Sequence, residues 1–355
     1  MQRSVLPDAL ANATCPWAAS VSLSLAAVVL TAALPLIPWL LARWMGWARS
    51  WAPRPTVELG CSGRLLAVAA AATASVALTI SIADARGLAW PPSWDTDRTC
   101  TYHVMFCEPT QASHLVRHVG NAYSNVAYLF AGLTVLGSQR THHSPLYIPD
   151  VCFGLALLAL AVASFLWHAS NAPKVHYVDL AVMETVISYL QLRYACLAIH
   201  RSFRLSVSTE AWLCTALFTA IVAYQTELSA HRWQAGSMEN GFPTGRSRLA
   251  GEGGLPLFEV CLFIATPILY YLVPCMAMLA SGSVGSLRLA TVSIASLITG
   301  WEVHLLERWA LDGLCIPDAG VLGAVSSPTA IFHALTGVTL LTAYFHVRSL
   351  ELVKS

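Results

Sequence analysis

The chain has 355 residues, of which 56% are hydrophobic and 11% are charged, and its formal net charge at pH 7 is +1. A soluble protein carries about 25% charged residues, so this composition is typical of a protein embedded in a lipid bilayer. The small net charge, without a lysine-rich run, excludes a nucleic-acid partner. The ten cysteines form no C-x-x-C pair, which argues against a thiolate zinc site.

Runs of roughly 18 or more mostly apolar residues can cross a bilayer as helices. We find nine such runs, and they cover residues 18–42, 64–84, 122–138, 148–168, 178–199, 211–229, 256–280, 287–309 and 327–347. These runs predict an all-α integral membrane protein.

Basic residues in the connecting loops predict which face is cytosolic. They follow spans one, three, five, seven and nine, and are Arg43, Arg49, Arg54, Arg64, Arg140, Arg201, Arg204, Arg288, Arg348 and Lys354. If the spans alternate, all of them lie on one face, and the N-terminus and the 229–255 loop lie on the other. That second face also holds four cysteines in an oxidising compartment: Cys15, Cys100, Cys107 and Cys315.

Four polar residues lie near the ends of predicted spans. Ser164 and His168, one helical turn apart, close the 148–168 run, Asp179 opens the next run, and His333 lies just inside the last one. Alternation of the spans places all four at similar depth near the exoplasmic face. Ionisable groups within a membrane are costly and usually functional.

Metal-assisted hydrolysis is the chemistry that this set suits. Zinc held by neutral imidazoles lowers the pKa of a bound water to about 7. A carboxylate such as Asp179 can take the proton of the attacking water, and a hydroxyl such as Ser164 can stabilise the oxyanion. Taken singly, an interfacial histidine or a serine bonded to a backbone carbonyl is the simpler explanation. The matched spacing and depth favour a site.

Ordered motifs give the chain a resemblance to the alkaline ceramidases. Residues 121–125 match the family pattern N-x-x-S-N, and residues 164–168 match S-x-x-x-H, with Asp179 at the family's distance from the histidine. Residues 309–312, followed by Cys315, match W-x-x-D followed by a cysteine. Residues 332–337 match the second half of H-x-x-x-H-x-L-T-G, and the four motifs come in the family's order. The resemblance covers about 105–348, seven of the nine spans. The two N-terminal spans fall outside it.

The resemblance implies a seven-helix, zinc-dependent hydrolase in residues 101–355, preceded by an extension, 1–100, with two transmembrane helices. Such an enzyme cleaves the amide of ceramide lipids to a sphingoid base and a fatty acid. By the same resemblance His168 and His333 are zinc ligands, Asp179 activates water, and Ser164 supports the metal or the oxyanion. A disulfide between Cys107 and Cys315 is also implied.

The chain departs from the family at two places. Thr329 stands where the remaining zinc ligand is expected, four residues before His333. The sequence offers as substitutes His304, Glu302, Glu307 and His176. The calcium loop keeps Glu108, whereas Met105, Thr110 and His118 replace oxygen-rich ligands, so we do not expect calcium binding.

Two functions from different classes follow. The first is a zinc-dependent amidase acting on a ceramide-type lipid, in the endoplasmic reticulum or Golgi membrane, with a lumenal N-terminus and a cytosolic C-terminus. The alternative is a catalytically impaired, lipid-binding or receptor-like membrane protein. A related branch that acts on lipid-anchored proteins places its aspartate three positions after the histidine, so the eleven-residue spacing between His168 and Asp179 argues against that branch.

Overall fold

The structure, a computed structural model, describes residues 63–88, 90, 108, 114–138, 144–234, 284–309 and 327–352. The described part is all-helical and contains no strand, as the composition predicts. Its helices are α3 (Gly63–Ala85), α4 (Val119–Ser124), α5 (Val126–Gly137), α6 (Tyr147–Ser170), α7 (Pro173–Phe203), α8 (Val207–Gln234), α11 (Val284–Trp309) and α13 (Pro328–Leu352). The predicted spans 18–42 and 256–280 lie outside the described residues.

Four of the described helices are long and apolar enough to cross a membrane: α3, α6, the 207–227 part of α8, and α13. They indicate a protein of the lipid bilayer. The helices α7 and α11 are also long, but they are not among these four. Large apolar side chains on the outside of the bundle fit this environment, since Trp212 on α8 is 71% exposed and Val68 on α3 is 66% exposed.

The predicted 122–138 span is divided in the structure. Asn125 separates α4 from α5, although its backbone stays close to helical, with φ −66° and ψ −11°. Its side-chain amide donates hydrogen bonds to the carbonyls of Asn121 (2.8 Å) and Ala122 (3.3 Å), so the side chain competes for carbonyls within the helical turn. The 12 residues of α5 extend only about 18 Å, less than the roughly 30 Å of a hydrocarbon core.

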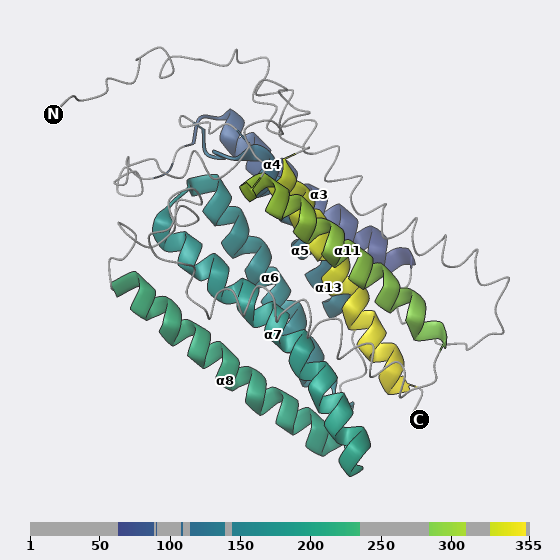
Figure 1. Cartoon of the computed structure of the whole chain (residues 1–355). Helices are drawn as coiled ribbons and strands as arrows, with labels where there is room; N and C mark the ends of the chain where they lie inside the picture. The colour runs from purple at the N-terminus through teal and green to yellow at the C-terminus, as the bar shows by residue number, and fades with distance from the viewer. Residues whose placement is uncertain are drawn as a thin grey trace.

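The helices pack around α13, which lies against α11, α5, α4 and α7 (Figure 1). The helix α6 packs between α5 and α7, α8 lies along α7, and α3 lies along α5. One end of the bundle holds α4, the end of α6, and the beginnings of α7 and α13. We call this end the α4 end, and it contains the four polar residues singled out above.

The middle of the bundle is aromatic. The ring of Phe153 on α6 stacks on Tyr189 of α7, with centroids 4.6 Å apart, and on Tyr344 of α13 at 5.8 Å. All three side chains are buried. Aromatic pairs contribute about 0.5–1.5 kcal/mol beyond their buried area, so this triple contact holds α6, α7 and α13 together.

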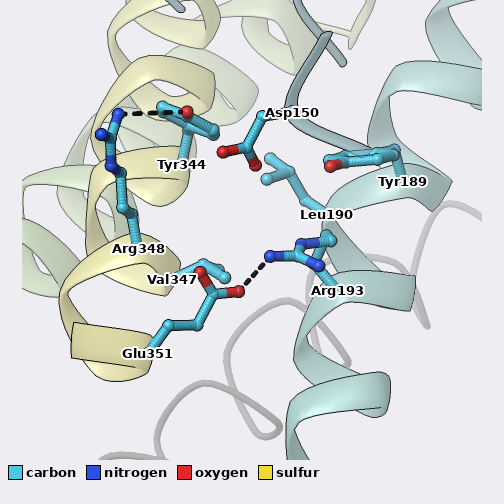
Figure 2. A pocket seen from close by; sticks show the side chains of 8 residues that line it. All are labelled: Asp150, Tyr189, Leu190, Arg193, Tyr344, Val347, Arg348 and Glu351. Atoms are coloured by element: carbon cyan, nitrogen blue, oxygen red, sulfur yellow. Dashed lines mark hydrogen bonds and ion pairs between the residues drawn. The ribbon is translucent and has the colours of Figure 1, made fainter. Parts of the chain in front are cut away.

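A cluster of buried charges lies at the other end of the same three helices (Figure 2). Arg193 of α7 forms an ion pair with Glu351 of α13. Arg348 of α13 donates a hydrogen bond to the carbonyl of Ser138, and Asp150 of α6 faces the same cleft. The side chains that line this cleft leave no room for a water molecule between them. We call these residues the Arg193 cluster and regard it as a connection between helices.

Candidate functional site

The turn between α6 and α7 brings two of the predicted site residues together. The helix α6 ends at Ser170 because Asn171 adopts a left-handed conformation (φ 55°, ψ 26°), which asparagine tolerates better than most residues. Pro173 then begins α7, a position that suits proline. The chain therefore reverses over two residues. The reversal places Asp179 against the last turns of α6, where its carboxylate lies close enough to the hydroxyl of Ser164 to accept a hydrogen bond.

The two predicted histidine ligands are neighbours in the structure. The rings of His168 on α6 and His333 on α13 have centroids 5.0 Å apart, with an angle of 60° between their planes. Both side chains are buried, as are those of Ser164 and Asp179. The structure thus places all four residues inside the bundle, near its α4 end, as a hydroxyl–carboxylate pair and an imidazole pair.

Close packing of α13 on α5 positions His333. A Cβ atom on Gly337 would lie 2.7 Å from the Cβ of Ala127, so only glycine permits this approach. One residue before it, the Thr336 hydroxyl is 2.5 Å from the Tyr128 hydroxyl, and the Tyr128 ring lies 5.8 Å from the ring of His333. His333, Thr336 and Gly337 therefore share one contact between α13 and α5.

The His333 ring also contacts α4. Its Nδ1 atom lies 2.9 Å from Oγ of Ser124 and 3.2 Å from the carbonyl oxygen of Asn121. These two residues belong to the N-x-x-S-N motif at positions 121–125. Two motifs that are far apart in the sequence thus meet in one contact.

Further histidines surround the imidazole pair. The ring of His118, just before α4, lies 6.5 Å from the ring of His168, and its backbone N–H donates to the His168 carbonyl (3.1 Å). The ring of His176 packs on Trp167 with centroids 4.4 Å apart. From the sequence, His118 was expected only as a departure from a calcium loop, and its place beside His168 was not predicted. The position of His118 directly before an apolar run was the available indication in the sequence.

At position 329, where the family resemblance predicts a histidine ligand, Thr329 contacts a histidine of α11. The hydroxyl of Thr329 lies 3.4 Å from Nδ1 of His304 on α11. The His304 ring stacks on Phe332, with centroids 4.7 Å apart and planes 25° apart. His304 therefore lies next to the position that the family resemblance assigns to a ligand. The side chains of Glu302 and Glu307 lie outside the described residues.

The described residues around the imidazole pair do not form a complete zinc site. In residues that the structure describes, no group of three or more His, Cys, Asp or Glu side chains is placed to hold a metal ion. A catalytic zinc site usually has three protein ligands plus water. The described part supplies two adjacent imidazoles, so by itself it does not fit a complete zinc site, and we assign no chemical step to the metal.

The predicted disulfide between Cys107 and Cys315 lies outside the described residues. Among the cysteines that are described, Cys152, Cys196 and Cys214 are free thiols. The Glu108 side chain, expected at the start of a degraded calcium loop, accepts hydrogen bonds from the backbone N–H groups of Gly120 (2.6 Å) and Asn121 (2.9 Å). It therefore holds the first turn of α4.

No family model, curated protein or solved structure matches this chain. Its own fold and site define its class. It is a helical membrane protein in which carboxylate, hydroxyl and imidazole groups are gathered inside one end of the bundle.

Proposed function

We propose that this chain is a membrane-embedded hydrolase that cleaves the amide bond of ceramide-type lipids into a sphingoid base and a fatty acid. The observation that carries the proposal is the position of the Ser164–Asp179 pair in the same buried region as the adjacent rings of His168 and His333. Such groups are expensive to keep inside a membrane protein without a function. The motif resemblance to the alkaline ceramidases supplies the substrate class.

The residues supply the steps of amide hydrolysis as follows. Asp179 accepts a proton from water as the water oxygen bonds to the amide carbon. Asp179 then gives the proton to the leaving nitrogen as the carbon–nitrogen bond breaks, which yields an amine and a carboxylic acid. An ionised carboxylate only accepts hydrogen bonds, so the Ser164 hydroxyl donates to Asp179 and orients the base.

Zinc is a separate part of this proposal. His168 and His333 are the two ligands that we propose, and a third would have to come from outside the described side chains or from a movement of His304. The metal content of the purified protein tests this part. Roughly one zinc per chain supports metal dependence, and its absence in an active protein assigns water activation to Asp179 alone.

A ceramide hydrolysis assay on the full-length protein in lipid nanodiscs tests the proposal as a whole. We expect release of sphingoid base by the native protein. Replacing Asp179 with asparagine should lower the rate by about 10²–10⁴-fold, the range typical of a lost general base. The matched control is Asp150→Asn, which changes another buried aspartate, in the Arg193 cluster. Equal rates for both variants would reject the role of Asp179.

We also propose the orientation and location predicted from the loops. The α4 end faces the lumen of the endoplasmic reticulum or Golgi, the N-terminus is lumenal, and the C-terminus is cytosolic. The distribution of Arg204 after α7 and Arg348 near the end of α13 supports this orientation. Labelling of cysteines introduced at residues 204 and 352, in sealed vesicles, should occur from the cytosolic side.

One observation favours a second function. Because the described residues lack a three-ligand metal site, the chain is also a candidate for a lipid-binding or receptor-like protein that retains the helical bundle without hydrolysis. The two functions differ in one measurement. A non-catalytic protein would bind a labelled ceramide and release it unchanged, whereas the hydrolase would release the free base.

A further inference from the structure

The contacts of His333 determine which of its ring nitrogens carries the proton. Nδ1 lies 3.2 Å from the carbonyl oxygen of Asn121, and a carbonyl oxygen can only accept a hydrogen bond. The second neighbour of Nδ1 is Oγ of Ser124, at 2.9 Å. The Ser124 hydroxyl donates its single proton to the Asn121 carbonyl (2.8 Å), so its oxygen is also an acceptor toward the ring. Both neighbours therefore face Nδ1 as acceptors, and a protonated Nδ1 is the ring state that fits them.

We infer that Asn121 and Ser124 are positioning residues that hold His333 as the tautomer with its proton on Nδ1 and a free lone pair on Nε2. The two ring nitrogens of a histidine are distinct, and the hydrogen bond of one sets the state of the other. While this contact holds, Nε2 of His333 can bind a metal or accept a proton, and it cannot donate one. The use of that lone pair in amide hydrolysis rests on the proposed function, whereas the tautomer rests on the contacts alone.

The α4 turn is built to keep this arrangement rigid. The carboxylate of Glu108 accepts the N–H groups of Gly120 and Asn121, which fixes the backbone that carries the accepting carbonyl. Ser327, directly before α13, donates to Oδ1 of Asn121 (2.8 Å). The side chain of Asn121 thus connects the beginning of α13 to α4. The backbone carbonyl of the same residue contacts the ring of His333, which lies six residues after Ser327 on α13.

Burial of the contact favours one tautomer of His333 over the other. Asn121 is fully buried, and Ser124 and His333 are 7% and 6% exposed. Water therefore does not compete for the ring nitrogen, and an unsatisfied buried polar group costs about 1–3 kcal/mol. A proton on Nε2 in place of Nδ1 would set the bare Nδ1 against the Asn121 carbonyl oxygen, which places two acceptors 3.2 Å apart in a buried contact.

Nitrogen NMR of the full-length protein in detergent micelles tests this inference, because ring nitrogens with and without a proton have different chemical shifts. The protein is labelled with ¹⁵N-histidine, and the His333 signals are assigned by comparison with His333→Gln. We expect a protonated Nδ1 and an unprotonated Nε2. A proton on Nε2 would overturn the inference.

Variants separate the role of Ser124 from general effects on folding. Ser124→Ala removes one acceptor, so we expect a second tautomer of His333 to appear, and Ser124→Thr should restore a single one. The matched control is Ser349→Ala, because Ser349 is also 7% exposed and its hydroxyl donates to the carbonyl three residues earlier (2.7 Å). An unchanged tautomer in Ser124→Ala would reject the role of Ser124 and leave the Asn121 carbonyl as the only determinant.

The same experiment distinguishes this inference from the proposed function. If Nδ1 carries the proton but the protein does not hydrolyse ceramide, the inferred tautomer is correct and the proposed function is wrong. If Nε2 carries the proton and the protein hydrolyses ceramide, the proposed function is correct and the inferred tautomer is wrong. If Ser124→Ala does not fold, the native protein and Ser124→Thr still decide the tautomer.

Discussion

Thr329 lies one helical turn before His333 on α13, and its hydroxyl is 3.4 Å from Nδ1 of His304 on α11. Residues four apart share one face of a helix, so the Thr329 side chain points to the same side of α13 as the His333 ring. A histidine at position 329 would therefore stand beside His333 and compete for space with His304.

We predict that Thr329→His increases zinc binding, because it adds a third imidazole next to His168 and His333. Thr329 is 2% exposed, and overfilling a packed region costs about 1–3 kcal/mol, so the variant should also be less stable. Adding His304→Ala should recover stability and keep the zinc. The measurements are zinc per chain after dialysis against a weak chelator, and thermal unfolding in detergent. Zinc absent from the native protein and from both variants would end the case for a metal site.

The Ser164 hydroxyl is predicted to matter through Asp179. Hydrogen bonds to charged groups contribute about 1.5–3 kcal/mol. If this energy is lost only in the transition state, Ser164→Ala should lower the rate of ceramide hydrolysis by roughly 10–150-fold. Ser164→Thr keeps the hydroxyl and should retain most of the rate. A rate for Ser164→Ala equal to that of the native protein would exclude this residue from the site.

Gly337 is predicted to be intolerant of any side chain. A Cβ there would lie 2.7 Å from the Cβ of Ala127 and 3.2 Å from its backbone, so Gly337→Ala should destabilise the protein by about 1–3 kcal/mol. Gly63→Ala is the control, because a Cβ at Gly63 meets nothing within 4 Å. Thermal unfolding of the two variants in the same detergent gives the comparison. Similar melting temperatures would show that α13 can move away from α5 at little cost.

The ion pair between Arg193 and Glu351 predicts a non-additive effect on stability. The two side chains are 2% and 5% exposed, and removal of one partner of a buried pair costs about 3–5 kcal/mol because the other charge is left uncompensated. Arg193→Met and Glu351→Met should each destabilise strongly, and the double variant should be more stable than the sum of the two changes implies. Arg204→Met, at an exposed position, should change stability by less than about 0.5 kcal/mol. Strict additivity would show that the two charges do not interact.

Helix positions were the part of this structure most accessible from sequence. The predicted spans 64–84, 148–168 and 327–347 correspond to α3, α6 and α13, because the apolar content of a membrane-spanning helix is a property of its own residues. The prediction was less complete where helices extend beyond the apolar run. The predicted span 211–229 is the middle of α8, whose ends at Val207 and Gln234 are polar turns that hydropathy does not detect.

The candidate site also has features that the sequence predicts and features that it does not. The common depth of His168 and His333 follows from alternating spans, and it needs no knowledge of packing. The contact of Tyr128 with Thr336, and that of Ser327 with Asn121, depend on which helices are neighbours and how each is rotated about its axis. Neither property is encoded in the spacing of one segment, so these contacts were inaccessible from the sequence.

The division of the site between the α6–α7 turn and α13 has a consequence for biosynthesis. Ser164, His168 and Asp179 are held by one short reversal, so their part of the site can form as soon as α6 and α7 have entered the bilayer. His333 is translated only after α8 and α11. A ribosome-bound chain that has not yet reached α13 therefore carries half of the candidate site, and the adjacent rings of His168 and His333 come together only when insertion has proceeded through that helix.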